Sequence, residues 1–352
     1  MELQTTSLEP RTTQVHFSGN GREYFGIWIV NLLLSVLTLG IYSAWAKVRT
    51  LQYFYGHSRV DGQGFRYLAT PLQILKGRLI AVAFFAVISL LSHFFPVFAL
   101  VFAIVFLFLT PWLLNQSLKF NFRMTSYRNV RFGFNGTYLG SLLNFVIYPL
   151  LSMFTLFLAL PLAMRALDKY IVQHSTYGKK SFQTDPDVGP YYAATFLSGL
   201  LSMGIVLLMG LIIGSSMYAD PAATAGPGNS MLVTVAMFFS YALIGALSGA
   251  LYQVWIRNHL FGRTRLEGLV ELESAVPVSA ALYVAVTNLL LLLVTAGLAF
   301  PWTKVRKAKL LAAGTQITLY PALDQLYDQL STPSSVVAEE LADLYDVDFA
   351  LI

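Results

Sequence analysis

The chain has 352 residues, of which 56% are hydrophobic and only 12% are charged, and its formal net charge is +5. A soluble domain carries about 25% charged residues because its surface must stay hydrated, so this composition excludes an ordinary soluble protein. The chain has no cysteine, which excludes disulfides, thiol catalysis and thiolate metal sites.

Charge-free windows mark the predicted membrane segments. They are 24–46, 79–118, 132–164, 188–219, 221–256 and 274–303. Each can hold a helix that crosses a hydrocarbon core of roughly 30 Å, and the second is expected to break at Ser92-His93-Phe94-Phe95-Pro96, because proline disrupts a helix interior. We therefore predict an all-α integral membrane protein with about seven hydrophobic segments, near 26–46, 79–92, 96–115, 139–163, 192–217, 231–256 and 279–301.

Three regions follow from this pattern. Residues 1–23 are polar and lack the apolar stretch of a cleaved signal peptide. Residues 24–320 form the predicted membrane domain. The last region, 321–352, is an acidic tail in which Ser335 is a candidate helix N-cap. That helix would either be solvated or dock on the basic surface of the protein.

The positive charges predict the topology. Lys and Arg are retained on the cytoplasmic side of a membrane, and they occur in every connection except 93–95 and 218–230. Segments two and three, and segments five and six, should therefore form two hairpins with their tips outside. If segments one, four and seven cross fully, some basic loops must lie outside. Either these segments are re-entrant or broken helices with both ends cytoplasmic, or they cross fully and the charge rule is weakly obeyed.

Two stretches of the chain align with each other. Residues 31–49 match residues 288–306 at a constant offset of 257 positions. A weaker match at an offset of 117 includes segment four, so we predict internal repeats at about 15–80, 120–185 and 255–320. In each repeat a helix continues into an aromatic, basic stretch with alternating residues, which predicts small cytoplasmic β-like extensions.

The polar residues in the charge-free windows are the candidates to line a substrate-binding site. They are Asn31, Thr38, Asn144, Thr155, Asn288 and Thr295. In one interpretation they form hydrogen bonds between helices and cap broken helices, at about 0.6–2 kcal/mol each. In the other they line a pocket for a small neutral or zwitterionic solute.

A second set of residues follows the first and last segments. It consists of Trp45, Lys47, Arg49, Trp302, Lys304 and Arg306. Aromatic and basic residues together are typical of membrane-interface anchors, and such bases also attract anionic lipid headgroups. The bases are spread along membrane edges, so we expect lipid and not nucleic acid as their partner.

Chemistry-bearing motifs are otherwise scarce. The six windows contain no Asp, Glu, Lys or Arg, and no histidine pair has the spacing of a zinc peptidase. We therefore expect no catalytic residue, no metal site, no cofactor and no enzyme activity.

One motif carries a resemblance to a known family. The run TLGIYSAWAKVR, with Phe17, Tyr24 and Asn31 before it and Asp61-Gly62 and Lys76-Gly77-Arg78 after it, resembles the YjgN-like family of bacterial multi-pass inner-membrane proteins over roughly residues 15–320. The resemblance implies a location in the bacterial inner membrane, with most basic loops cytoplasmic, but no known activity. It also implies a membrane-associated metallopeptidase as a partner.

Two functions are consistent with these features. The first is a noncatalytic scaffold or regulator of a membrane partner, which the absence of buried charge favours. The second is a transporter or channel for a small solute, built on the repeated Asn and Thr residues.

Overall fold

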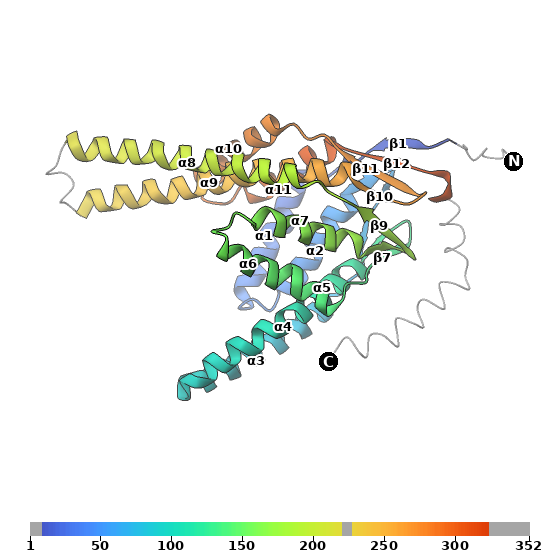
Figure 1. The fold of residues 1–352 in the computed structure, drawn as a ribbon, viewed down its shortest axis with the longest axis horizontal. Helices are drawn as coiled ribbons and strands as arrows, with labels where there is room; N and C mark the ends of the chain where they lie inside the picture. The colour runs from blue at the N-terminus through green and yellow to red at the C-terminus, as the bar shows by residue number, and fades with distance from the viewer. Residues whose placement is uncertain (1–8, 220–226, 324–352) are drawn as a thin grey trace.

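The computed structural model describes residues 9–219 and 227–323 of the chain. Its strands gather at one end, and its helices extend away from them (Figure 1). The helices are α1 (Gly21–Leu37), α2 (Ser43–His57), α3 (Pro71–Phe94), α4 (Pro96–Arg123), α5 (Tyr138–Leu142), the π-helix η1 (Leu143–Ile147), α6 (Tyr148–Phe154), α7 (Leu160–Gln173), α8 (Val188–Ala219), α9 (Pro227–Gly262), α10 (Val278–Val294) and α11 (Phe300–Ala313).

The strands are short and lie between the pairs of helices in sequence. They are β1 (Arg11–Gln14), β2 (His16–Phe17), β3 (Ser58–Val60), β4 (Gln63–Gly64), β5 (Arg66–Tyr67), β6 (Thr125–Tyr127), β7 (Val130–Phe134), β8 (Ser175–Tyr177), β9 (Lys180–Thr184), β10 (Thr264–Leu266), β11 (Val270–Ser274) and β12 (Thr315–Leu319). Each stretch of chain between helix pairs therefore belongs to one layer of strands.

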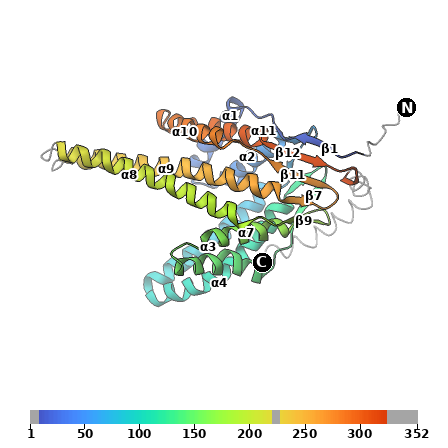
Figure 2. The ribbon, with the colours of Figure 1, turned by 45° about the horizontal axis from the view of Figure 1, so that its top comes forward.

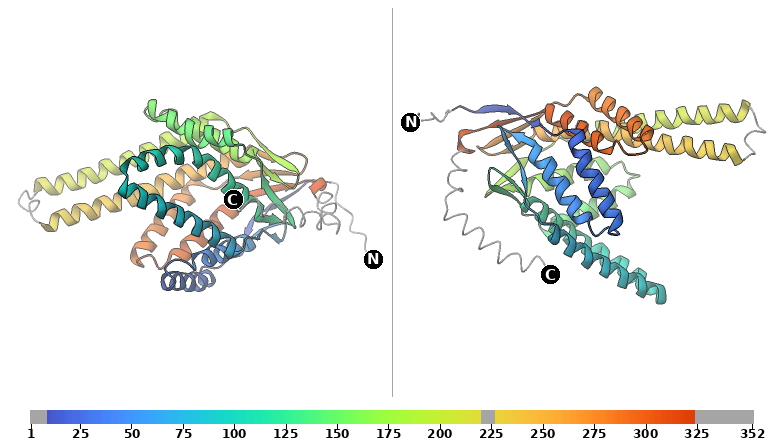
Figure 3. Two further views of the ribbon diagram at one scale, coloured as in Figure 1. Left: turned by 90° about the horizontal axis from the view of Figure 1, so that it is seen from below. Right: turned by 180° about the vertical axis from the view of Figure 1, so that it is seen from behind.

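The chain repeatedly leaves this layer of strands, forms a helical hairpin and returns to the layer. Two hairpins are long: α3 with α4, and α8 with α9. Three are short: α1 with α2, the continuous α5–η1–α6 with α7, and α10 with α11. Figure 2 shows α8–α9 extending well beyond the other helices, and Figure 3 shows α1 and α2 side by side. Long and short hairpins alternate along the chain.

The long hairpins have the length and composition of membrane spans. Four helical stretches qualify, at Pro71–Phe94, Pro96–Arg123, Val188–Ser215 and Val233–Gly262. The first pair is separated at Phe95, as the proline at position 96 predicts. The connection between the second pair, residues 220–226, lies outside the described residues. Both long hairpins agree with the pairing of segments two and three and of segments five and six.

The short hairpins reverse direction in similar turns. In the first, Leu39 and Gly40 have φ values of 50° and 90°, and in the last, Ala296 and Gly297 have φ values of 47° and 88°. The Gly40 N–H donates to the Ser35 carbonyl at 2.7 Å. A left-handed residue with such a back-reaching bond is a common way for a helix to end. The chain thus folds back after about 17 residues in each case, and both ends of the hairpin lie at the strands.

The strands form one connected layer around a core. Nine of them pair in the order β1-β12-β11-β10-β9-β8-β7-β6-β5, and β2-β3-β4 form a second sheet. Only Val15 separates β1 from β2, and only Phe65 separates β4 from β5, so the second sheet joins the two edges of the first. The result is a ring of strands, and all of its pairings are antiparallel.

Side chains from around the ring fill its interior. They include Val60, Tyr127, Tyr177, Leu266 and Leu319, all of which are buried. The Tyr127 hydroxyl donates to the Val60 carbonyl at 2.9 Å, and the Tyr177 hydroxyl donates to the Tyr127 carbonyl at 3.0 Å. These bonds satisfy the polar ends of two buried aromatic side chains. The ring is therefore a packed core rather than a pore.

The structure is mostly helical, as predicted, but the expectation of an all-α fold is wrong because the chain also forms a large antiparallel sheet. The predicted β-like extensions exist, but they join into one large sheet instead of remaining separate. Each strand has only two to five residues, so its local sequence shows alternation without revealing a partner far along the chain. The expected set of about seven segments also differs, because segments 26–46, 139–163 and 279–301 each contain a turn and parts of two helices.

The ends of the chain differ in how much of them is described. The polar N-terminal region, 1–23, contributes β1, β2 and the start of α1. The acidic region, 321–352, lies outside the described residues except for 321–323.

Candidate functional site

The three candidate threonines form the turns of the short hairpins. The Thr38 hydroxyl donates to the Leu34 carbonyl at 2.7 Å and accepts from the Tyr42 N–H at 2.9 Å. Thr295 makes the same two bonds, to the Leu291 carbonyl at 2.6 Å and from the Ala299 N–H at 3.1 Å. Each hydroxyl thus bonds one of the last carbonyls of the first helix, which also accepts from the threonine's own N–H, and one of the first amides of the next helix.

The third threonine follows the same pattern with a small shift. The Thr155 hydroxyl donates to the Ser152 carbonyl at 2.9 Å and accepts from the Ala159 N–H at 3.0 Å. Each of the three threonines therefore makes a hydrogen bond that fits its interpretation as a helix cap.

The three asparagines have different surroundings. The Asn288 amide donates to the Thr303 carbonyl at 3.3 Å, and its oxygen accepts from Arg306 at 3.0 Å. Asn144, in the π-helix, donates to the Gly140 carbonyl of its own helix at 2.8 Å. Asn31 is 4% exposed and, among the described residues, neither polar atom of its side chain has a hydrogen-bond partner. The bonds of Asn144 and Asn288 stay within their own hairpins and do not converge on one centre.

The expected interface residues lie along α2 and α11. Trp45 is half-buried and stacks on Tyr42 with ring centroids 6.0 Å apart. Trp302 packs on α1, with its ring 4.9 Å from that of Phe25. A side chain at Gly21 would collide with Trp302, because a Cβ there would lie 2.4 Å from the indole ring. Trp302 therefore joins the first hairpin to the last in addition to lying near the surface.

The basic members of this set differ in how exposed their side chains are. Lys47 and Arg49 are exposed, and Lys304 is exposed with its ammonium 5.0 Å from the Phe300 ring centroid. Arg306 is half-buried and bonds inside its own hairpin. Arg49 also lines a groove on the first hairpin.

The tips of the short hairpins are apolar and exposed. Leu39, Leu156 and Val294 have 96%, 85% and 86% of their surface exposed. These residues flank the threonine turns, where a soluble protein would place polar side chains. A set of leucine and valine side chains at the end of each hairpin is the surface that a lipid environment favours.

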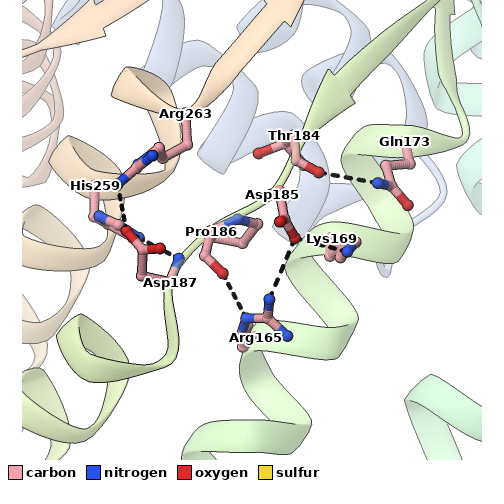
Figure 4. A network of polar contacts seen from close by, with 9 residues as sticks. All are labelled: Arg165, Lys169, Gln173, Thr184, Asp185, Pro186, Asp187, His259 and Arg263. Carbon is pink, nitrogen blue, oxygen red and sulfur yellow. Dashed lines mark hydrogen bonds and ion pairs between the residues drawn. The ribbon is translucent and has the colours of Figure 1, made fainter.

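A polar network that sequence reasoning missed ties the middle of the chain together. It joins α7 to the segment 184–187 before α8 and to the end of α9 (Figure 4). Asp185 accepts from Lys169 at 2.7 Å and lies 3.3 Å from Arg165. Asp187 accepts from Arg263 at 2.6 Å. The hydrogen bond and charge of Lys169 hold the pKa of the exposed Asp185 carboxyl below its ordinary value.

The remaining bonds of the network involve the backbone of the same segment. The Asp187 N–H donates to Nε2 of His259 at 2.8 Å, and the Gln173 amide donates to the Thr184 carbonyl at 2.9 Å. Arg165 also donates to the Pro186 carbonyl. The network fixes where the second long hairpin leaves the ring, and its charges are all paired.

Next to the network lies a partly buried carboxyl. Asp168, on α7, accepts from the Tyr191 hydroxyl of α8 at 2.7 Å. Burial raises the pKa of Asp168, and the bond from Tyr191 opposes that rise. In sequence Asp168 stands between Arg165 and Lys169 and is typical of a solvated helix face, so no local signal shows that α8 covers it.

The histidine, aspartate and glutamate side chains of the described residues do not gather into a metal site. In residues 9–219 and 227–323, no group of three or more His, Asp or Glu side chains could hold a metal ion. His57 and His174, which occupy equivalent positions, each place Nδ1 within 2.8 Å of the carbonyl four residues earlier, at Tyr53 and Tyr170.

Four long apolar helices that rise from a ring of strands define a multi-pass membrane protein. Comparison with known proteins identifies its family. Residues 12–344 match the model of the family described as bacterial protein of unknown function (DUF898). The chain belongs to this family.

Its relatives include proteins called "Inner membrane protein YjgN". Those of Escherichia coli O157:H7 and Escherichia coli strain K12 are each 37% identical over 120 residues, which is 34% of this chain. The match covers 30% of the length of each E. coli protein. The Salmonella typhimurium strain LT2 protein is 24% identical over 350 residues, 86% of this chain and 87% of the relative. No solved structure matches the chain.

Proposed function

We propose that this protein is a noncatalytic scaffold or regulator that holds a membrane partner against its long hairpins. The observation that supports this most is how little of the hairpin surface the protein itself covers. Only 6% of the apolar window of α3 and of α4 is buried inside the chain, and only 11% of that of α8 and of α9. Most of this surface is free for lipid or for the helices of another protein.

The base of each hairpin supports the same role. The ring and the Asp185 and Asp187 network hold α8 and α9 where they leave the strands. A transporter surrounds its pathway with packed helices near the membrane midplane, whereas here only 6% to 11% of the apolar window of each long helix is buried, although α4 and α9 also pack on α5 and α10. A rigid base with two uncovered hairpins is the geometry of a docking platform.

The proposal includes an orientation in the membrane. The ring and the basic connections lie in the cytoplasm, the long hairpins cross the bilayer, and the exposed tips of the short hairpins dip into the cytoplasmic leaflet. Because the chain has no cysteine, single cysteines can report this directly. Ser92→Cys, near the α3–α4 tip, should react with an impermeant maleimide in intact spheroplasts. Lys179→Cys, in the β8–β9 connection, should react only after lysis.

Photo-crosslinking in the native membrane tests the partner. A photoreactive residue is placed at Leu90 on α3 and at Leu207 on α8, both of which are exposed, with buried Leu319 in the ring as control. A scaffold should give one discrete protein adduct at the hairpin positions and none at Leu319. A membrane-associated metallopeptidase is the expected partner class. Adducts to lipid alone at both positions would contradict the proposal.

A transporter for a small neutral or zwitterionic solute is the second candidate. The three broken helices favour it, since broken helices often hold solutes in transporters. The threonine hydroxyls at the breaks are already bonded within the turns, which weighs against a pocket there. Uptake of pooled amino acids and sugars into liposomes that contain the protein, above empty liposomes, would favour transport over the scaffold.

A further inference from the structure

The first and last short hairpins carry the same asparagine and arginine pair in two different states. In the last hairpin the pair is closed. Arg306 donates to the Asn288 side-chain oxygen at 3.0 Å and to the Thr287 hydroxyl at 2.9 Å. Two acceptors therefore hold this guanidinium inside the hairpin.

In the first hairpin the pair is open. Asn31, the counterpart of Asn288, is buried without a hydrogen-bond partner among the described residues. Arg49, the counterpart of Arg306, is exposed, and its guanidinium carbon lies 5.9 Å from the Tyr42 ring centroid. The position of Thr287 is taken here by Val30. Because valine offers no acceptor, the guanidinium has lost one of the two groups that hold its counterpart.

The open arginine lines a groove between α1 and α2. The groove has a volume of about 460 Å³ and is lined by Gly26, Ile27, Val30, Arg49, Gln52 and Tyr53. The Tyr53 hydroxyl is already engaged, since it accepts from the Asn20 N–H and donates to the Asn20 carbonyl. The guanidinium and the exposed Gln52 amide thus form the polar end of the groove, and Ile27 and Val30 form its apolar wall.

The apolar wall continues along α1 to the tip of the hairpin. Val30, Leu33 and Leu37 are exposed and follow each other at helical spacing, so they share one face. A ligand that fits this surface has a negative group at one end and a hydrocarbon chain of comparable length at the other. An unpaired guanidinium recognises phosphate with charge-assisted hydrogen bonds.

We propose that this groove is a binding site for an anionic membrane phospholipid. Arg49 and Gln52 bind the phosphate, and one acyl chain lies along Val30, Leu33 and Leu37. The last hairpin has no equivalent site, because Arg306 is held by Asn288 and Thr287. The proposal goes beyond the scaffold role and requires only that the first hairpin contacts the bilayer.

Native mass spectrometry of the full-length protein in detergent tests the site. The probes are phosphatidylglycerol, phosphatidylcholine with the same chains, and inorganic phosphate as a competitor. We expect phosphatidylglycerol to bind about tenfold more tightly than phosphatidylcholine, since a hydrogen bond to a charged group contributes on the order of the energy of a tenfold change. Inorganic phosphate should compete weakly, because it lacks the acyl chain.

Three variants locate the effect. Arg49→Gln should remove the preference for phosphatidylglycerol, and Lys179→Gln, at an exposed base in the β8–β9 connection that changes the net charge equally, should leave it intact. Val30→Thr restores the missing acceptor without altering charge. It should draw Arg49 inward and lower phosphatidylglycerol binding several-fold. Thermal midpoints should show that each variant is folded.

The opposite outcomes would overturn the proposal. Equal losses in Arg49→Gln and Lys179→Gln would mean that binding follows net charge and not this groove. An unchanged preference in Arg49→Gln would place the lipid elsewhere. Full displacement by inorganic phosphate would make the groove a site for a free anion instead of a lipid.

Discussion

The short and the long hairpins expose apolar surface by different means. In the short hairpins, a threonine turn fixes the reversal, and contacts such as Phe25 with Trp302, 4.9 Å between ring centroids, fix one hairpin against another. In the long hairpins, the two helices pack on each other and α4 and α9 also contact α5 and α10, but only 6% to 11% of each apolar window is buried. The fold is therefore specified tightly near the ring and the short hairpins and loosely in the long ones. The same substitution should have unequal effects in the two regions.

Alanine in place of glycine should show the largest difference. A Cβ at Gly64, in the ring, would lie 2.6 Å from the backbone oxygen of Gly56, which cannot move aside alone. Gly64→Ala should lower the free energy of unfolding by about 1–3 kcal/mol. Gly210→Ala, in α8, has open space around it and should raise stability by about 0.5–1 kcal/mol. Thermal unfolding in detergent measures both, and equal effects would remove the contrast.

Valine in place of threonine compares a turn with a long helix. Thr295→Val removes both bonds of the last turn and should cost about 1–2 kcal/mol, the range for loss of a helix cap. Thr110→Val removes only a bond to the Phe106 carbonyl within α4, so its cost should be much smaller. Chemical unfolding followed by circular dichroism separates the two. A larger loss in the α4 variant would show that the turns are not what holds the short hairpins.

The two carboxyls beside α7 should respond to pH in opposite directions. The pKa of Asp168 is raised in the fold, so the native state holds the proton more tightly and stability falls as pH rises above the ordinary carboxyl pKa. Asp168→Asn should remove that fall and be at least as stable at pH 7. If the stability of this variant still falls as pH rises, the fall comes from another titrating group.

Asp185 provides the reverse case. Its pKa is lowered by Lys169, so its contribution is present above the ordinary carboxyl pKa and is lost as pH falls through the lowered value. Asp185→Asn should therefore lower the thermal midpoint slightly at pH 7 and have no effect near pH 2. Midpoints measured from pH 2 to pH 8 test both carboxyls together.

The smallest effect is expected inside a long hairpin. Ser248 and Ser202 share a hydrogen bond of 2.8 Å between α9 and α8. Ser248→Ala should cost about 0.6 kcal/mol, the average for such bonds between membrane helices. The change should leave the crosslinking pattern at Leu207 unaltered. A cost as large as that of Thr295→Val would show that the long hairpins are also held by specific bonds.

Local sequence signals predicted the hairpins well. Pro96 marked the break between the first two spans, and the basic residues paired the long helices correctly, because both signals act within a few residues. The cap and the solute-pocket interpretations of the threonines both stay predictions, although each hydroxyl has its acceptor and its donor within about one helical turn.

Contacts between distant segments were not predictable in the same way. Nothing near Arg11 indicates that β1 pairs with β12, and nothing near Asp168 indicates that Tyr191 covers it. Asn31 and Asn288 look equivalent in sequence, yet Asn288 is bonded to Arg306 and neither polar atom of the Asn31 side chain has a partner among the described residues. The residues just before them differ, since Thr287 also accepts from Arg306 and position 30 is a valine.

The pairing of β1 with β12 affects the order in which the protein folds during its synthesis. Arg11–Gln14 leave the ribosome about 300 residues before Thr315–Leu319, which at ordinary translation speeds is a wait of roughly 15 to 60 s. During that interval every helical hairpin can enter the bilayer while the first strand still lacks its neighbour. The ring can therefore close only after β12 has been made, and a chain that ends before β12 keeps an open sheet edge at β1.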